Sequence, residues 1–333
     1  MIQKDFWSKS RVAVIGGGSF GTVLAQLVAK NALEVRMWVR DEEQARMINA
    51  TRTNPDAIKD ITLASNIKAC SDPAKVFEGG VQAVLWALPS SACREQARNL
   101  AHLFNGEEIL IHATKGIEEG TLKRISEVLR EEIPCRRIGV MSGPNLAVEL
   151  GHGEPAATVV ASDFDEVIEA GKSLLHSERF RVYTDHDVVG VEWAGTLKNI
   201  LAIAAGALDA MKLGWNARAL LITRGLAEIV RFGKALGAQE STFLGLAGVG
   251  DLLATCSSPL SRNYRVGFKL AQGEKLEKVI EELGAVAEGV RTVISVREFA
   301  NEHGISMPIT EAVYHLLQSD ASVQEILHQL MTR

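Results

Sequence analysis

Short apolar runs alternate with amphipathic stretches through the first half of this chain, and that alternation limits the folds open to it. Each run has the length and composition of a strand buried on both faces. Strands that alternate with helices form βαβ units, in which a parallel sheet carries helices on both faces. The runs predicted as strands are Arg11–Ile15, Glu34–Val39, Val81–Leu88, Glu108–Ala113 and Arg137–Met141, with Pro155–Ser162 and Phe180–Asp185 as two further candidates.

The pattern changes near Asp187, where the strand signals end. From Val188 to Gln329 the sequence reads as long helices rich in small residues. A chain of 333 residues is long enough for two domains with separate cores. We therefore expect an α/β fold, with a doubly wound, mostly parallel sheet over residues 1–187 and an all-helical domain over residues 188–333.

Composition and charge argue against several classes of protein. The net charge of −5 does not suit a general nucleic-acid binder. Cys70, Cys93, Cys135 and Cys256 show no metal-ligand or redox spacing, so we expect reduced thiols and no metal site. The N-terminus has no apolar signal segment, and the longest strongly apolar run, Ile200–Leu208, is too short to span a bilayer. These features predict a cytoplasmic protein without membrane insertion.

A glycine-rich turn joins the first predicted strand to the first predicted helix. Gly16, Gly18 and Gly21 satisfy the pattern G-x-G-x-x-G in the required context of strand, turn and helix. In that pattern the first glycine permits a tight turn, the second admits a pyrophosphate and the third lets the helix pack closely. We therefore expect a Rossmann-type dinucleotide site, and a glycine-rich turn without a ligand is the alternative.

The end of the second predicted strand bears on which dinucleotide is bound. NAD-binding proteins usually place an acid there to bond the ribose 2′-hydroxyl. This chain has Arg40 at that place, followed by Asp41. An arginine can pair with a 2′-phosphate, whereas a solvated arginine would leave the choice open. We expect NADP or NAD as cofactor, with NADP favoured.

The candidates for proton transfer are lysines rather than histidines. Hydride transfer to or from an alcohol carbon needs a group that moves the alcohol proton. Lys198 lies in the apolar helical stretch Gly190–Asp209, where burial would lower its pKa and a bound phosphate would raise it; a lysine that snorkels at a helix groove is the alternative. Lys115 follows a predicted strand, at the edge where ligands of such sheets bind. The alternative is a solvated loop lysine. Asp251, after a glycine-rich turn, either bonds a substrate hydroxyl, holds Lys198 or caps a helix.

A second anion-binding pattern lies in the helical half. Ser261 is a good N-cap for a helix predicted over residues 262–272, and a helix N-terminus offers unpaired N–H groups to an anion. Arg262 adds a planar fork of donors that suits phosphate oxygens. A capped surface helix with a solvated arginine is the alternative. We favour an anion site because the chain begins with another phosphate-binding turn.

Six segments, taken in order, resemble the bacterial type of the NAD(P)-dependent glycerol-3-phosphate dehydrogenase family, and the resemblance spans nearly the whole chain. They are GGGSFGTVLA, HATKGIE, MSGPNLAVEL, GVEWAGTLKNILAIAAGALD, LAGVGDLLATCSSPLSRN and AVAEGVRT. The resemblance implies an oxidoreductase that reversibly interconverts sn-glycerol 3-phosphate and dihydroxyacetone phosphate. It also implies that reduction supplies glycerol 3-phosphate for phospholipid synthesis.

The resemblance further implies a role for individual residues, with Lys198 as the proton acceptor or donor at the C2 oxygen. The substrate contacts that it implies are Lys115, Gly143, Asn145, Lys198, Asp251, Ser261, Arg262 and Asn263. The predicted cofactor contacts, with the glycines of the glycine-rich turn included, are Gly16, Gly18, Ser19, Phe20, Gly21, Arg40, Lys115, Ala147, Arg262, Val286 and Glu288; those other than the glycines are implied by the resemblance. The family usually has Ser or Thr at position 145, Phe at position 146 and often Trp at position 20, which we interpret as differences in tuning.

Two other functions are weighed against this one. β-Hydroxyacid dehydrogenases share the fold and a catalytic lysine, but they place an asparagine four residues after it, where this chain has Ala202. A catalytically silent dinucleotide sensor would be expected to lack Lys198, Lys115 or Arg262, and all three are present. The expected partners are the small-molecule substrates, without nucleic acid, and a homodimer through the helical half is compatible with the sequence.

Overall fold

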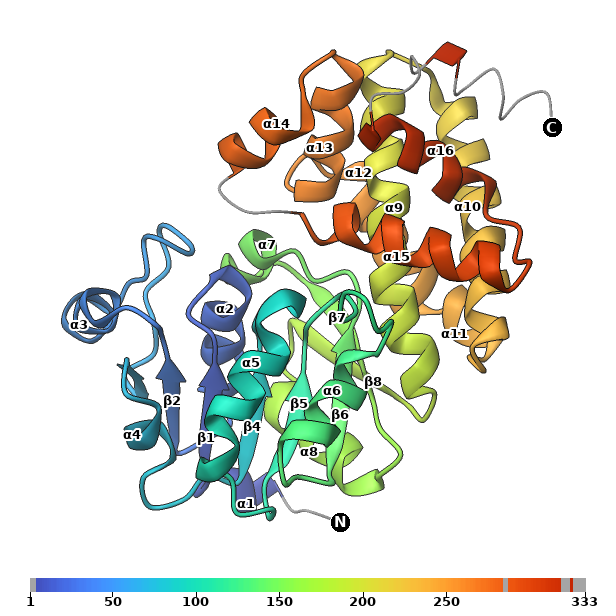
Figure 1. Ribbon diagram of the computed structural model, residues 1–333. Coiled ribbons are helices and arrows are strands. Elements are labelled where there is room, and N and C mark those ends of the chain that lie inside the picture. Colours follow the sequence, from blue (N-terminus) through green and yellow to red (C-terminus); the bar gives the residue numbers. More distant parts are fainter. Residues whose placement is uncertain (1–3, 284–286, 319–323, 326–333) are drawn as a thin grey trace. The chain divides into compact units, whose positions relative to one another are not determined.

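The computed structural model describes residues 4–283, 287–318 and 324–325, and it divides into two compact units (Figure 1). The first, called the sheet unit, comprises residues 1–114 and 125–188. The second, called the helical unit, comprises residues 115–124 and 189–333. The boundary at residue 187 stays a prediction. It assigned residues 115–124 to the first domain, whereas the structure groups them with the helical unit.

An eight-stranded sheet forms the centre of the sheet unit, in the order β3-β2-β1-β4-β5-β6-β7-β8. Neighbouring strands pair in parallel except β6 and β7, which are antiparallel. The chain order runs outward in both directions from β1, which is the arrangement of a Rossmann fold with its ligand site at that point. The strands are β1 (Arg11–Ile15), β2 (Glu34–Trp38), β3 (Ile67–Cys70), β4 (Ala83–Trp86), β5 (Ile109–His112), β6 (Ile138–Ser142), β7 (Ala156–Ala161) and β8 (Phe180–Asp185).

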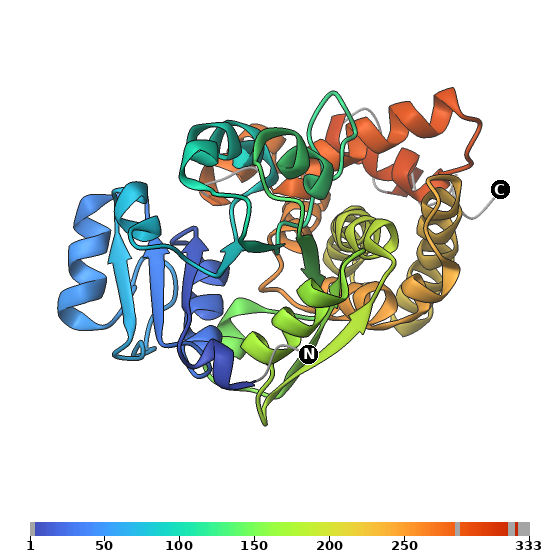
Figure 2. The same cartoon turned by 90° about the horizontal axis from the view of Figure 1, so that it is seen from below.

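Helices cover both faces of this sheet (Figure 2). Val12 and Val14 of β1 belong to a core shared with α2 and α8, whereas the alternate residues Ala13 and Ile15 belong to a core shared with α5 and α6. The central strands β1, β4, β5 and β6 are therefore buried on both sides, as their sequences predict. The helices of this unit are α1 (Lys4–Trp7), α2 (Ser19–Val28), α3 (Glu42–Thr51), α4 (Pro73–Phe77), α5 (Ser90–Leu100), α6 (Ile125–Glu132), α7 (Ala147–Gly151) and α8 (Asp165–Leu175), with a 3-10 turn at Ala101–Leu103.

The helical unit is built around α9 (Val188–Ala210), which the other helices of that unit surround (Figures 1 and 2). By length and composition α9 could cross a membrane, but most of its residues are buried inside the unit, as in a core helix. The other elements are α10 (Trp215–Ala235), α11 (Glu240–Leu244), a π-turn at Leu246–Gly250, α12 (Asp251–Ser257), α13 (Arg262–Ala271), α14 (Leu276–Leu283), α15 (Glu288–Glu302) and α16 (Pro308–Gln318). The predicted fold class, a Rossmann-type sheet followed by helices, is confirmed.

The segment 115–124 leaves the sheet unit after β5 and joins the helical unit. Ile117 is buried in the core of the helical unit, and Arg124 forms an ion pair of 2.8 Å with Glu192 of α9. The amphipathic pattern of residues 122–132 predicts a helix there, but α6 begins at Ile125, because Leu122 has a φ of +57° and the chain forms a bridge between Ile117 and Arg124. This excursion places Lys115 in the helical unit.

Candidate active site

The glycine-rich turn lies between β1 and α2, where the sequence predicts it. Gly16 has a φ of +126°, and a Cβ there would lie 2.7 Å from the main-chain oxygen of Ala87. A Cβ on Gly21 would collide with the main-chain oxygen of Gly16, so neither position accepts a side chain. A Cβ on Gly18 would meet nothing within 4 Å, and Gly18 is the N-cap of α2 without a side-chain cap. An uncapped helix N-terminus beside open space fits the pyrophosphate of a dinucleotide.

Two residues at the end of β2 have different surroundings. Arg40 is exposed, and no carboxylate pairs with it within the described part of the chain. The Asp41 side chain accepts a hydrogen bond of 2.8 Å from the Gln44 main-chain N–H and caps α3. One oxygen of the Asp41 carboxylate is therefore used in a helix cap, while the Arg40 side chain is open to solvent.

The other predicted cofactor residues of the sheet unit lie close to α2. The Ser19 hydroxyl donates a hydrogen bond of 2.6 Å to the main-chain oxygen of Ala57. Phe20 and Ala147 are half-buried against the core that contains α2. Glu288 is the first residue of α15 in the helical unit, and Val286 lies outside the described residues.

Gly143 and Asn145, two predicted substrate residues, follow β6 in the sheet unit. Gly143 has a φ of +151°, and a Cβ there would lie 3.1 Å from the Ala157 main-chain oxygen. Asn145 donates from Nδ2 to the same oxygen at 2.9 Å, so its side chain ties the loop to β7. Its buried Oδ1 has no hydrogen-bond partner among the described residues and can accept one from a ligand.

Three predicted charged residues meet inside the helical unit. Lys115 Nζ lies 2.7 Å from Asp251 Oδ2, and Lys198 Nζ forms an ion pair with Asp251 Oδ1. Lys198 and Asp251 are buried, with 5% and 1% of their surface exposed, whereas the Lys115 side chain is 19% exposed. One carboxylate is therefore shared by two ammonium groups, of which Lys115 is the more accessible to solvent.

Burial dominates the electrostatics of this cluster. It lowers the pKa of Lys198 to about 7, against the opposing effect of the Asp251 charge and with the added repulsion of Lys115. Burial alone would raise the pKa of Asp251, but the charges of Lys115 and Lys198 outweigh it and hold that pKa below its usual value. Lys198 can therefore hold or release a proton near neutral pH while Asp251 stays ionised.

Thr255, which sequence reasoning missed, completes the surroundings of Lys198. Its Oγ1 accepts a hydrogen bond of 2.7 Å from Lys198 Nζ and donates one of 2.7 Å to the Asp251 main-chain oxygen. An ammonium group has three N–H donors, and Asp251 and Thr255 take two of them. A threonine four residues after an aspartate on one helix face is the signal that could have identified it.

The predicted anion site begins α13. Ser261 Oγ accepts a hydrogen bond of 3.3 Å from the Tyr264 N–H, which confirms the predicted N-cap. Arg262 is exposed in the first turn. Asn263 Oδ1 accepts a hydrogen bond of 3.0 Å from the Gly289 N–H, so the start of α15 is tied to the start of α13.

Gly289 is the point at which three helices come together. A Cβ there would lie 2.7 Å from Asn263 Oδ1 and 2.9 Å from the Asn199 main-chain oxygen on α9. Asn199 in turn donates from Nδ2 to the Lys115 main-chain oxygen at 3.2 Å. These contacts connect α9, α13, α15 and the segment 115–124. Each residue that makes them is a predicted site residue or the neighbour of one.

Family models of the NAD-dependent glycerol-3-phosphate dehydrogenase N-terminus and C-terminus match residues 11–168 and 187–328. This chain belongs to that family. It is 45% identical to the glycerol-3-phosphate dehydrogenase (NAD(P)+) of Pseudomonas paraeruginosa, over 96% of this chain and 94% of the relative. It is 44% identical to the enzyme of that name from Acinetobacter baumannii, over 96% and 89% of the two chains.

The crystal structure of glycerol-3-phosphate dehydrogenase from Coxiella burnetii has a TM-score of 0.91 to this chain, with 35% identity over 98% of this chain and 99% of the other. A ketopantoate reductase from Ralstonia eutropha, 18% identical with a TM-score of 0.61, shares the fold alone. These similarities confirm the predicted family and the class of NAD(P)-dependent oxidoreductases. The individual site residues of this glycerol-3-phosphate dehydrogenase family member stay predictions.

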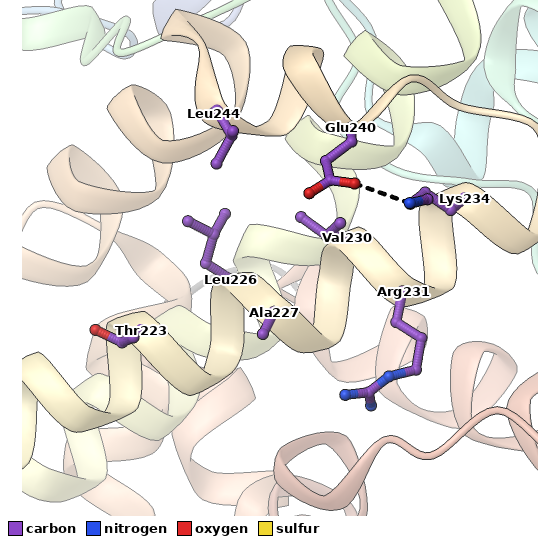
Figure 3. A pocket seen from close by; sticks show the side chains of 8 residues that line it. All are labelled: Thr223, Leu226, Ala227, Val230, Arg231, Lys234, Glu240 and Leu244. Atoms are coloured by element: carbon purple, nitrogen blue, oxygen red, sulfur yellow. Dashed lines mark hydrogen bonds and ion pairs between the residues drawn. The ribbon is translucent and has the colours of Figure 1, made fainter.

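A surface groove between α10 and α11 contains none of the predicted site residues (Figure 3). Its volume is about 500 Å³, and Lys234 and Glu240 form an ion pair of 2.8 Å at one side of it. Leu226, Val230 and Leu244 give it an apolar lining. The titratable Lys234 and Glu240 of the groove are exposed and paired with each other, whereas Lys198 is buried beside Asp251, so the lysine cluster is the candidate active site.

Proposed function

We propose that this chain is an NAD(P)-dependent glycerol-3-phosphate dehydrogenase, which interconverts dihydroxyacetone phosphate and sn-glycerol 3-phosphate. The observation that carries the proposal is the buried Lys198, held between Asp251 and Thr255 in a chain of this family. A bound nicotinamide cofactor supplies the chemistry of hydride transfer. The residues of this chain bind the reactants, orient them and move the proton.

Lys198 is the proposed proton donor and acceptor at the substrate C2 oxygen. When the carbonyl is reduced, its oxygen must gain a proton, which the charged Lys198 donates. When the alcohol is oxidised, neutral Lys198 accepts the proton. Because the pKa of Lys198 is about 7, both forms are populated near neutral pH, as general acid–base catalysis requires.

The helix start at Ser261, Arg262 and Asn263 is proposed to hold the substrate phosphate. Helix α13 has ten residues and presents N–H groups at its first turn, and the exposed Arg262 adds charged donors. Phosphate bound there would orient C2 toward the reacting groups, and orientation is a large contribution to such rates. The remaining substrate contacts that we propose are Lys115, Gly143, Asn145 and Asp251.

We propose that NADP is preferred over NAD. Arg40 is exposed at the end of β2, and Asp41 is committed to the N-cap of α3. The 2′-phosphate of NADP would therefore meet a cation rather than a free acid. The proposed cofactor contacts are those of the glycine-rich turn together with Ser19, Phe20, Arg40, Lys115, Ala147, Arg262 and Glu288.

In the cell, we propose, the enzyme is cytoplasmic and supplies glycerol 3-phosphate for phospholipid synthesis. Its relatives are named for the same activity, which supports the production of glycerol 3-phosphate. The homodimer stays a prediction.

The test follows the loss of reduced-nicotinamide absorbance with dihydroxyacetone phosphate, with NADPH and NADH in parallel. Lys198→Met should lower kcat by roughly 10²- to 10⁴-fold, the usual contribution of general acid–base catalysis, with little loss of cofactor affinity. Lys234→Met is the matched control, because its ion pair with Glu240 is exposed and lies outside the cluster. Turnover of a β-hydroxyacid in place of dihydroxyacetone phosphate, or full activity of Lys198→Met, would contradict the proposal.

A further inference from the structure

The main-chain carbonyl of Gly17, in the glycine-rich turn, is held by two amide side chains. Gln44 Nε2 on α3 and Asn54 Nδ2, which follows α3, each donate to Gly17 O at 3.0 Å. Asn54 is 1% exposed, so this contact is shielded from water. A carbonyl that accepts from two side chains, one of them buried, has little freedom to turn.

Every N–H of these two amides has an acceptor. Gln44 Nε2 also donates to Asn54 Oδ1 at 3.0 Å, and Asn54 Nδ2 also donates to Thr22 Oγ1 at 2.8 Å. Thr22 in turn donates to the main-chain oxygen of Gly18 at 2.9 Å. The bonds form a network between the turn, the first turn of α2 and the segment after α3, and a network of this kind fixes a single arrangement.

The network sets the direction of the neighbouring N–H group. In a trans peptide the C=O and N–H point in opposite directions, and no described peptide bond is cis. Because Gly17 O points toward Asn54 and Gln44, the Gly18 N–H points away from them. Gly18 is the N-cap of α2 and has open space beside it, so this N–H is a donor for an anion at the helix start.

We propose that Asn54, supported by Gln44, is a positioning residue for dinucleotide binding, and that it acts by fixing the Gly17–Gly18 peptide with its N–H toward the pyrophosphate. The inference rests on the proposed function, because it assumes that a dinucleotide binds at this turn. The pyrophosphate is common to NADP and NAD, so Asn54 affects both alike. Asn54 lies in the sheet unit and takes no part in the lysine cluster.

The test is Asn54→Asp, which keeps the shape of the side chain but places an oxygen against the Gly17 carbonyl in place of a donor. Calorimetry without substrate measures the Kd of NADPH, of NADH and of ADP-ribose, which carries the pyrophosphate but no nicotinamide. We expect all three affinities to fall by a similar factor of roughly ten, the value of a lost buried hydrogen bond. The Tm of each variant is measured alongside.

Asn66→Asp is the matched control, because Asn66 Nδ2 donates to the main-chain oxygens of Ala29 and Ala32 in the same unit, away from the turn. It should lower Tm without changing the three Kd values. If Asn54→Asp does not fold, Gln44→Glu makes the same exchange of donor for acceptor at a half-buried position and should weaken all three ligands together.

The outcomes separate the inference from the proposed function. Unchanged Kd values in both Asn54→Asp and Gln44→Glu, or the same loss in Asn66→Asp, would overturn the role of Asn54. A loss for NADPH alone would also overturn it, because that pattern belongs to a 2′-phosphate contact. A wild-type protein that binds none of the three ligands would instead overturn the proposed function.

Discussion

Replacing Asp251 by asparagine should move the proton-transfer step to lower pH. Asp251 is the counter-charge of Lys198 and opposes the effect of burial on its pKa. Without the Asp251 charge, burial and the repulsion by Lys115 still lower the pKa of Lys198. The pKa of Lys198, about 7 in the parent protein, should therefore fall further in Asp251→Asn.

The size of the shift follows from the contact between the charges. Two unit charges about 4 Å apart, at an effective dielectric constant of about 20, interact by about 4 kcal/mol. One pKa unit corresponds to about 1.4 kcal/mol, so the upper limit of the shift is about three units. The asparagine oxygen can still accept a hydrogen bond from Lys198, which reduces the loss, and we expect a fall of about one to two units.

The assay is the pH dependence of kcat/KM in both directions, since this quantity reports the groups of the free enzyme. Reduction requires charged Lys198, so its kcat/KM should fall as the pH rises through the pKa of Lys198. Oxidation requires the neutral amine and should show the opposite slope. The second ionisation of the substrate phosphate, near pH 6 for a phosphate ester, is common to every variant, so the difference between variants carries the result.

Asp209→Asn is the control for this experiment. Asp209 lies on the same helix, α9, but pairs with Arg218 and Tyr264 rather than with the lysine cluster. Its pH midpoint should equal that of the parent. A midpoint in Asp251→Asn that stays unchanged or moves to higher pH would refute the reasoning, because Asp251 would then not stabilise the charged form of Lys198.

Two further substitutions test the cofactor and substrate ends separately. Arg40→Ala should raise the KM for NADPH by roughly ten- to a hundredfold, the value of charge-assisted hydrogen bonds to a phosphate, and leave the KM for NADH unchanged; equal losses would contradict a 2′-phosphate contact. Gly289→Ala should raise the KM for dihydroxyacetone phosphate severalfold, because a methyl group there separates α15 from α9 and α13. Gly225→Ala is its control, since the atoms nearest to that Cβ belong to the Leu201 side chain rather than to a backbone. It should lower Tm alone, and equal KM values in the two variants would contradict the role of Gly289.

Much of the sheet could be predicted because its central strands are apolar on both faces. In β3, by contrast, Lys68 is exposed between the buried Ile67 and Ala69, so the strand shows no apolar run. It lies at the edge of the sheet, where one short alternation is too weak a signal. The start of α6 was misplaced for a different reason, since the chain near Leu122 follows contacts of the helical unit rather than local helix propensity.

The candidate site was predictable where a local pattern carries it. The glycine-rich turn and the Ser261 cap are contiguous in sequence, and their geometry follows from neighbouring residues. Asn54 could not be found in this way, because an isolated polar residue gives no sign of the distant group that it will contact. The spacing of Thr255 from Asp251 could have identified that residue, but not its contact with Lys198. The ion pairs of Lys198 and Lys115 with Asp251 likewise join residues far apart in sequence.

The excursion of residues 115–124 brings the charges that set the pKa of Lys198 into one unit. It places Lys115 in the helical unit, so the charges that set the pKa of Lys198 all belong to that unit, whereas Arg40 and the glycine-rich turn belong to the sheet unit. NADPH and NADH differ only in the 2′-phosphate, whose proposed contact is Arg40 rather than a residue of the lysine cluster. The pH midpoint of kcat/KM for dihydroxyacetone phosphate should be the same with both cofactors, even where they differ in KM. A midpoint that changes with the cofactor would mean that the 2′-phosphate reaches the lysine cluster electrostatically, and the pKa of Lys198 could then not be assigned to Asp251 and Lys115 alone.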